Sequence, residues 1–221
     1  MKLFIFWEYD QNRSNWLIHF ETRTAFAPLP QYKRFICKKC GKFSHDEVFK
    51  EGFPGDVDLR VKGDIFASDD GFLCFNNRVL GVMNACKFPG IVTKPLGKSG
   101  WHVVNISLRL GTTPDIFKVI KGPCSECGRL REVIGGVDHL GQLASLPNAE
   151  CFFSTIADRD ATGLADRNLF VTGGIVDAFK ANRIKGGVFH LLKDPETFRV
   201  ESAAWQRGER IKRPKGDYVI L

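Results

Sequence analysis

Four cysteines in two short and similar segments are the residues of this sequence best suited to bind a metal. The segments read Cys37-Lys-Lys-Cys40-Gly-Lys and Cys124-Ser-Glu-Cys127-Gly-Arg, so each is a CxxCG motif followed by a basic residue. The two-residue spacer lets both sulfurs of a motif face one ion, and the glycine permits the tight turn that brings backbone amides toward the thiolates. The pair of motifs therefore predicts one site with four sulfur ligands.

Four thiolates complete the tetrahedral coordination of Zn²⁺ and leave no position for a reactive water. The sequence thus predicts a structural zinc site with Cys37, Cys40, Cys124 and Cys127 as its ligands. Two separate disulfides, a redox-active CxxC pair and unligated thiols are the alternatives. His45 follows the first motif and could replace one cysteine, although four sulfurs are already available.

Basic residues flank both motifs, and they would offset the double negative charge of a zinc tetrathiolate. They are Lys38, Lys39, Lys42, Arg129 and Arg131. The motifs are separated by residues 41–123, a longer gap than a compact zinc ribbon contains, so a whole module must lie between them. A zinc ion would therefore close a long loop of the chain.

The seven cysteines are an odd number, and the first residues have neither the apolar length nor the cleavage site of a secretory signal. We therefore expect reduced thiols in a cytoplasmic protein. Cys74, Cys86 and Cys151 lie in apolar sequence surroundings, which predicts that they are buried as small hydrophobic residues. No apolar run approaches the roughly 18 residues of a membrane-spanning helix, so no membrane partner is expected.

The best candidate for catalytic chemistry is the segment 157–167, ADRDATGLADR. Its charged residues are Asp158, Arg159, Asp160, Asp166 and Arg167. These acids could bind a divalent ion or transfer protons, but alternating Asp and Arg is typical of a loop whose surface charges compensate one another. No nucleophile, base and oxyanion donors assemble around them, and the glycine pairs lack phosphate-loop spacing. We therefore expect neither enzyme activity nor a small-molecule substrate. His102, inside an apolar run, is expected to be a core residue with satisfied hydrogen bonds.

Two segments offset by 96 residues, Leu73–Val92 and Leu169–Val188, share one pattern of strand, N-cap, helix, turn and strand. Asn76 and Thr172 stand where an N-cap oxygen would accept from the first helical amides. Apolar residues then recur at helical spacing, and a glycine follows as a turn residue. The apolar positions are Val79, Leu80 and Met83 in the first copy and Ile175, Val176 and Phe179 in the second, and the turn glycines are Gly90 and Gly186.

The other apolar runs predict mainly strands. They are residues 101–108, 116–120, 130–134, 151–155, 188–192 and 218–221, with an opening strand pair in residues 1–30 and a helix near 139–144. With only two convincing helices, the sequence predicts an α+β fold with a mixed, strand-rich sheet, a few short helices and a pair of zinc knuckles. No long linker interrupts it, so we expect a single domain over residues 1–221. Its knuckles span residues 31–54 and 111–136, and its similar strand-helix-strand units span 55–110 and 165–195.

The motifs CKKCGK and CSECGR, together with NLFVTGGIVDAFKANRIKGGVFHLL, resemble the double-CxxCG motif family first noticed as paralogues in myxobacteria. That family looks related to immunity proteins of bacterial polymorphic-toxin systems, and the resemblance covers residues 35–192. It implies a protein made beside a toxin, which binds and neutralises that toxin in the cytoplasm without chemistry of its own. Within this hypothesis, polar loops would contact the toxin: residues 69–71, and Asp158, Arg159, Asp160, Asp166 and Arg167.

The net charge of +7, from 32 Lys and Arg against 25 Asp and Glu, favours an acidic partner. Immunity proteins against nucleases are often acidic, so the basic charge argues against a nuclease target and suits a toxin with an acidic cleft. The densest basic patch, residues 207–215, contains few aromatic residues, and nucleic acid is not the expected partner. A nucleic-acid-binding zinc-ribbon protein remains the alternative function.

Overall fold

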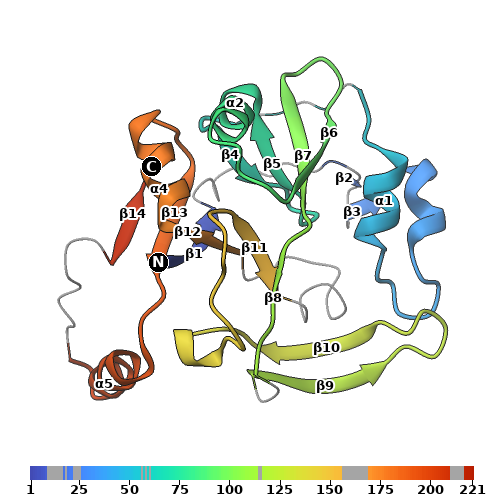
Figure 1. Cartoon of the computed structure of the whole chain (residues 1–221). Coiled ribbons are helices and arrows are strands. Elements are labelled where there is room, and N and C mark those ends of the chain that lie inside the picture. The colour runs from blue at the N-terminus through green and yellow to red at the C-terminus, as the bar shows by residue number, and fades with distance from the viewer. Residues whose placement is uncertain are drawn as a thin grey trace.

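The computed structural model describes residues 1–8, 17, 19–21, 26–55, 57, 59, 61–113, 116–155, 169–209 and 217–221. These residues form two larger sheets, two two-stranded ribbons and a set of short helices (Figure 1). This arrangement confirms the predicted α+β class. Among the described residues, no helix is both long enough and apolar enough to span a membrane.

The larger sheet has six strands in the order β14-β13-β1-β12-β11-β8. These are β14 (Tyr218–Ile220), β13 (Gly187–Leu191), β1 (Leu3–Glu8), β12 (Leu169–Thr172), β11 (Phe152–Thr155) and β8 (Arg109–Leu110). Neighbouring strands are antiparallel except β11 and β8, which are parallel. Strand β1 thus lies between two strands from the far end of the chain.

The second sheet has four antiparallel strands in the order β4-β5-β7-β6. They are β4 (Ile65–Ala67), β5 (Leu73–Asn76), β7 (Trp101–Ile106) and β6 (Ile91–Pro95). The ribbons pair β2 (His19–Glu21) with β3 (Phe26–Pro28) and β9 (Phe117–Pro123) with β10 (Leu130–Gly135). Residues 1–30, expected to hold one opening strand pair, contain β1, which pairs with β12 and β13, and the separate ribbon of β2 and β3.

Helices α2 (Asn77–Ala85) and α4 (Gly173–Ala181) are the two predicted from the sequence. The Asn76 side chain caps α2 by accepting from the N–H groups of Arg78 and Val79. Thr172 occupies the equivalent N-cap position, but its Oγ1 accepts from the N–H of Cys151 at 3.0 Å and makes no capping bond. The Thr172 cap was predicted wrongly because Cys151, just before β11, donates to its hydroxyl.

Two α-helices were missed. Helix α1 (His45–Glu51) begins after Ser44, whose hydroxyl accepts from the N–H of Glu47. Helix α5 (Pro195–Gln206) has Pro195 at its first position and Asp194 as its N-cap. The described residues also contain the 3₁₀ helices η1 (Pro30–Phe35) and η3 (Leu140–Gln142), and the single turn of η3 replaces the helix expected near 139–144. An N-cap aspartate followed by proline is a helix-start signal, so α5 could have been found.

The two strand-helix-strand units match element for element. Adding 96 to the residue numbers of β5, α2 and β6 yields the bounds of β12, α4 and β13. The turns after the helices match too: Lys87 and Arg183 have φ angles of 55° and 51°, and Gly90 and Gly186 have 82° and 99°. The offset seen in the sequence therefore marks a repeated backbone shape.

The surrounding sheets extend this match. Strand β7 lies between β5 and β6, as β1 lies between β12 and β13. Leu73 pairs with Val104 in one sheet, and the equivalent Leu169 pairs with Phe6 in the other. Strand β4 flanks β5 just as β11 flanks β12. The two halves thus share four equivalent strands and one helix, but the second half takes its central strand from residues 3–8.

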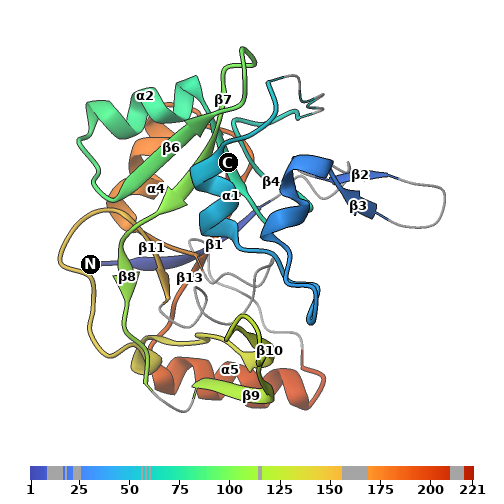
Figure 2. The ribbon, with the colours of Figure 1, turned by 90° about the vertical axis from the view of Figure 1, so that its right-hand side faces the viewer.

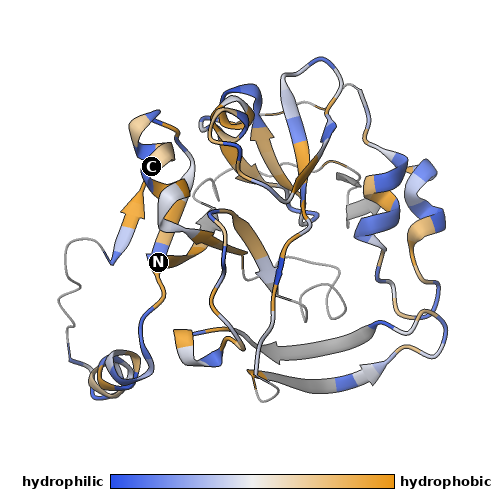
Figure 3. Ribbon diagram, in the orientation of Figure 1, coloured by the Kyte–Doolittle hydropathy of each residue, from blue (hydrophilic) through white to orange (hydrophobic). Residues whose placement is uncertain are grey.

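The helices of both halves share one core. The largest buried cluster contains Val79 and Met83 of α2 together with their equivalents Ile175 and Phe179 of α4, all at most 2% exposed. Phenylalanine rings fill much of the remaining space, and Figure 3 shows hydrophobic residues concentrated on β5, β11 and β12. Burying both helices in one cluster joins the two halves through apolar contacts.

A buried carboxylate ties residue 17 to the second sheet. Asp70 is fully buried, and its carboxylate accepts from the N–H of Leu17 at 3.0 Å and from the Ser68 hydroxyl at 2.5 Å. The Nε2 of His45 lies 3.1 Å from the Asp70 carbonyl oxygen. The expectation that residues 69–71 form an exposed partner loop is therefore wrong for Asp70, although Asp69 is exposed.

Replacing Asp70 with alanine should lower the free energy of unfolding by about 3 kcal/mol, because two buried donors would lose a charged acceptor. Urea denaturation measures this loss. The matched control is Asp177→Ala on the exposed side of α4, where we expect a change within about 0.5 kcal/mol. Equal effects of the two substitutions would contradict a structural role for the Asp70 carboxylate.

Candidate metal centre

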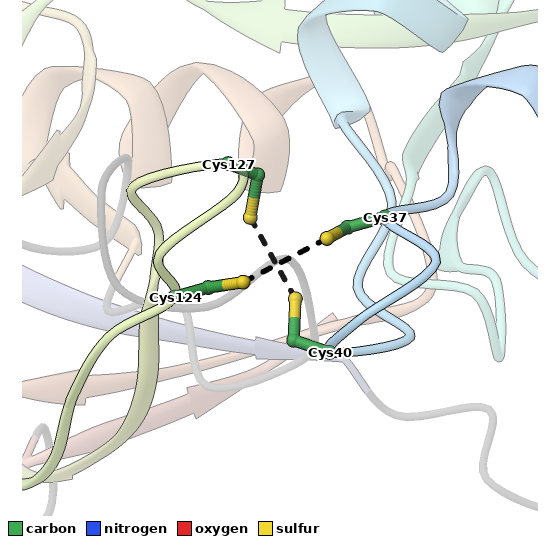
Figure 4. Close-up of side chains that lie close together, drawn as sticks. All are labelled: Cys37, Cys40, Cys124 and Cys127. Atoms are coloured by element: carbon green, nitrogen blue, oxygen red, sulfur yellow. Dashed lines mark hydrogen bonds between the residues drawn. The ribbon is translucent and has the colours of Figure 1, made fainter.

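Four sulfur atoms from two distant segments meet at one point. Cys37 and Cys40 lie between η1 and α1, and Cys124 and Cys127 lie where β9 turns into β10. All four Sγ atoms are within 4.8 Å of one another (Figure 4). Two short distances join the two segments: 3.7 Å from Cys37 to Cys124 and 3.6 Å from Cys40 to Cys127. This group of four cysteines could hold a metal ion.

The same backbone turn presents each cysteine pair. In both segments the N–H of the first cysteine bonds to the carbonyl five residues later, at 2.9 and 2.8 Å. The glycine N–H bonds back to the carbonyl of the first cysteine, also at 2.9 and 2.8 Å. Gly41 and Gly128 have φ angles of +73° and +72°, a region in which residues with a side chain are strained. These angles explain the glycine in each CxxCG motif.

The paired sulfurs are equivalent positions of the two halves. Cys37 and Cys124 are separated by 87 residues, as are Cys40 and Cys127. The same separation relates Ile65 of β4 to its counterpart in β11. Each half of the chain therefore supplies one cysteine pair, and equivalent cysteines face each other across the site.

Crowding of four thiols makes their ionisation uneven. The backbone N–H groups of Cys127 and Glu126 stabilise the Cys124 thiolate and lower its pKa to about 6. At Cys40 the backbone N–H of Lys42 also favours the thiolate, but burial and the neighbouring thiols outweigh it and raise the pKa to about 11. A cation placed among the sulfurs would remove this conflict, since it favours all four thiolates.

The charged residues around the sulfurs link the two segments. The Lys39 Nζ donates to the Ser125 hydroxyl at 2.6 Å, across the site. Arg129 lies 4.0 Å from Glu47 of α1. Glu126 was overlooked in the sequence, and its Oε2 is 3.7 Å from the Cys37 sulfur. At least two of the flanking basic residues thus have local partners.

His45 does not join the sulfur group. Its ring packs against Phe43 and Phe72, at centroid distances of 4.3 and 4.9 Å, and its Nε2 faces the carbonyl of Asp70. The side chain is 8% exposed. The histidine is therefore held by the neighbouring core, away from the position of a fourth ligand.

All seven cysteines are free thiols, and the sulfur distances at the site are far longer than the S–S bond of about 2.05 Å. Cys74 and Cys151 are fully buried, as predicted. Cys86 is exposed, so its prediction was wrong: it is the C-cap of α2, beyond the last buried turn. His102 is only partly buried, and its Nε2 bonds to Asn77 Oδ1 at 2.8 Å. Its hydrogen bond is satisfied, but it is not a core residue.

The predicted partner residues Asp158, Arg159, Asp160, Asp166 and Arg167 lie outside the described residues. Comparison with models of known protein families found no match, and a search of curated proteins found none either. The geometry of the sulfur group is therefore the main guide to function.

Proposed function

We propose that Cys37, Cys40, Cys124 and Cys127 bind one structural Zn²⁺ ion. The convergence of four sulfurs carries this proposal, because a tetrathiolate is a preferred environment of zinc and fills its tetrahedral shell. A closed shell offers no position for substrate or reactive water. The role of the ion is then to hold the two halves together at their equivalent turns.

We further propose that this scaffold is a cytoplasmic immunity protein, which binds and neutralises a cognate bacterial toxin. The resemblance of both CxxCG motifs and of residues 168–192 to the double-CxxCG family supports this function. The repeated halves and the long-range sulfur site also support it, because they build a rigid surface without needing a reaction centre. The basic net charge favours a toxin with an acidic surface.

Co-expression in bacteria tests the immunity function. The polypeptide encoded beside this gene is induced alone or together with this chain, and growth is measured. We expect growth arrest by the neighbour alone and rescue by the wild-type chain, with one-to-one binding at nanomolar affinity. The Cys37→Ser, Cys124→Ser double variant should rescue poorly, and Cys86→Ser is the matched control. A neighbour that is harmless, or harmful but not rescued, would contradict the proposal.

A nucleic-acid-binding zinc-ribbon protein is the second candidate, favoured by the basic residues next to the sulfurs. Two of these residues, Lys39 and Arg129, already contact Ser125 and Glu47, which reduces their availability for phosphates. Titration with labelled duplex and single-stranded DNA at several salt concentrations separates the two functions. Affinity that falls steeply with salt would favour nucleic acid and oppose the immunity function.

A further inference from the structure

The internal repeat reveals an uncovered sheet edge. Strand β6 is the last strand of the second sheet, and among the described residues it pairs with β7 alone. Its equivalent in the other half, β13, pairs with β1 on one side and carries β14 on the other. The first half has no counterpart of β14 in the described part of the chain. In Figure 2, β6 faces the viewer below α2.

The backbone of β6 is directed so that it could receive a strand at this edge. The N–H of Leu96 bonds to the Trp101 carbonyl, and the N–H of Ser107 bonds to the Gly90 carbonyl, both at 2.8 Å. Because antiparallel pairing alternates, the even-numbered β6 residues bond inward to β7. The N–H and C=O groups of Ile91 and Thr93 therefore point outward.

The same groups are in use on β13. Ile91, Thr93 and Pro95 correspond to Gly187, Phe189 and Leu191. There, the Gly187 carbonyl accepts from the N–H of Leu221 at 2.9 Å, as the Ile91 carbonyl could on β6. The N–H of Leu191 also bonds to the Asp217 carbonyl at 2.7 Å, a bond that Pro95 cannot repeat because proline has no N–H. The repeat thus shows, on this chain, how a strand docks on such an edge and in which register.

The side chains at the β6 edge define the chemistry of the occupant. Val92 is 52% exposed, whereas the equivalent Val188 is partly covered and pairs with Ile220 of β14. Lys94 occupies the position of His190, and its Nζ donates to the Lys50 carbonyl at 3.3 Å. A matching strand would place an apolar residue opposite Val92 and an acidic residue opposite Lys94.

We infer that the outer edge of β6 binds an extended, acidic and apolar segment of a partner protein as an added antiparallel strand. Identifying that partner as the toxin rests on the proposed function. A second copy of this chain is a poorer occupant, because it would bring another Lys94 and another Pro95 to the edge. Lysine and proline on an edge strand oppose self-pairing, and the net charge of +7 adds repulsion.

A peptide derived from β14 tests the edge without the toxin. It copies residues 216–221 with the change Tyr218→Glu, which places the acid opposite Lys94 in the β14 register. Titrated into the isotope-labelled full-length chain, it should shift the amide resonances of Ile91 and Thr93 most. The matched control peptide carries Tyr218→Lys and should bind about tenfold more weakly, because like charges would then face each other.

Three variants of the full-length chain sharpen the test. Thr93→Pro removes an outward N–H at an edge position where proline is tolerated, and it should weaken peptide binding at least about tenfold. Thr93→Val keeps that N–H and should bind as the wild type does. Lys94→Glu should make the chain bind the lysine peptide more tightly than the acidic peptide. This test does not depend on whether the Thr93→Pro variant folds.

Three outcomes would overturn the inference. They are peptide-induced shifts confined to β13 and β14, no shift at β6 at millimolar peptide, and self-association of the free chain that Thr93→Pro abolishes. The immunity function is judged separately by growth rescue. If growth rescue fails but the peptide binds, the immunity function is rejected and the docking edge stands. If growth is rescued but the peptide does not bind, only the docking edge is rejected.

Discussion

Replacing Cys124 with serine is expected to abolish stoichiometric metal binding and to cause a large loss of stability. The wild-type chain should contain one zinc ion per molecule, measured by mass spectrometry of metals after purification under reducing conditions. Structural zinc sites contribute binding free energies of about 10 kcal/mol or more to folding, and removal of one thiolate forfeits a large part of this. We therefore expect the thermal unfolding midpoint to fall by at least about 10 °C.

Cys86→Ser is the matched control for this substitution. Its thiol is exposed and lies outside the sulfur group, so metal content and the unfolding midpoint should stay as in the wild type. Adding a strong chelator to the wild-type chain should reproduce the unfolding midpoint of the Cys124→Ser variant. A wild-type chain that contains no zinc, or one whose unfolding midpoint does not change when the chelator is added, would contradict the structural zinc site.

Replacing Gly186 with alanine is expected to cause a large loss of stability outside the sulfur group. Gly186 has a φ of +99°, and a Cβ there would lie 2.5 Å from the Ile65 carbonyl oxygen, a backbone atom. Backbone strain and overpacking each cost about 1–3 kcal/mol, so the free energy of unfolding should fall by about 3–5 kcal/mol. Chemical denaturation with two spectroscopic probes measures this loss.

Gly208→Ala separates the two contributions. Gly208 also has a positive φ, +75°, but a Cβ there would meet nothing within 4 Å. The Gly208→Ala substitution should therefore lower the free energy of unfolding by the backbone strain alone, about 1–2 kcal/mol. If both alanine substitutions cost the same, the close approach of the Gly186 turn to β4 would not matter for stability.

The cysteine site and the repeat were accessible from the sequence because both are local patterns. The CxxCG spacing determines the turn of each knuckle. Predicting one shared site then required only the assumption that the two turns meet. The paired helices could be found because Val79 and Ile175, and likewise Met83 and Phe179, repeat the same helical spacing. Short-range periodicity of this kind survives in the folded structure.

The partners of each element could not be predicted, because they depend on contacts between distant residues. Nothing near Leu3–Glu8 indicates that this strand pairs with β12 and β13. Asp70 lies in a turn, as expected, but its burial was not predictable because its carboxylate accepts from Leu17, far away in the sequence. The Thr172 hydroxyl was assigned to α4, but in the folded chain it accepts from the N–H of Cys151.

The position of β1 has a consequence for synthesis on the ribosome. The two neighbours of residues 3–8 in the sheet begin at residues 169 and 187, so this apolar strand cannot pair with them until those residues have been translated. Its hydrogen-bonding groups and phenylalanines are exposed to other nascent chains meanwhile. Completion of the larger sheet is thus a late, non-local event, and cells that make this protein in quantity have reason to shield its first strand with chaperones.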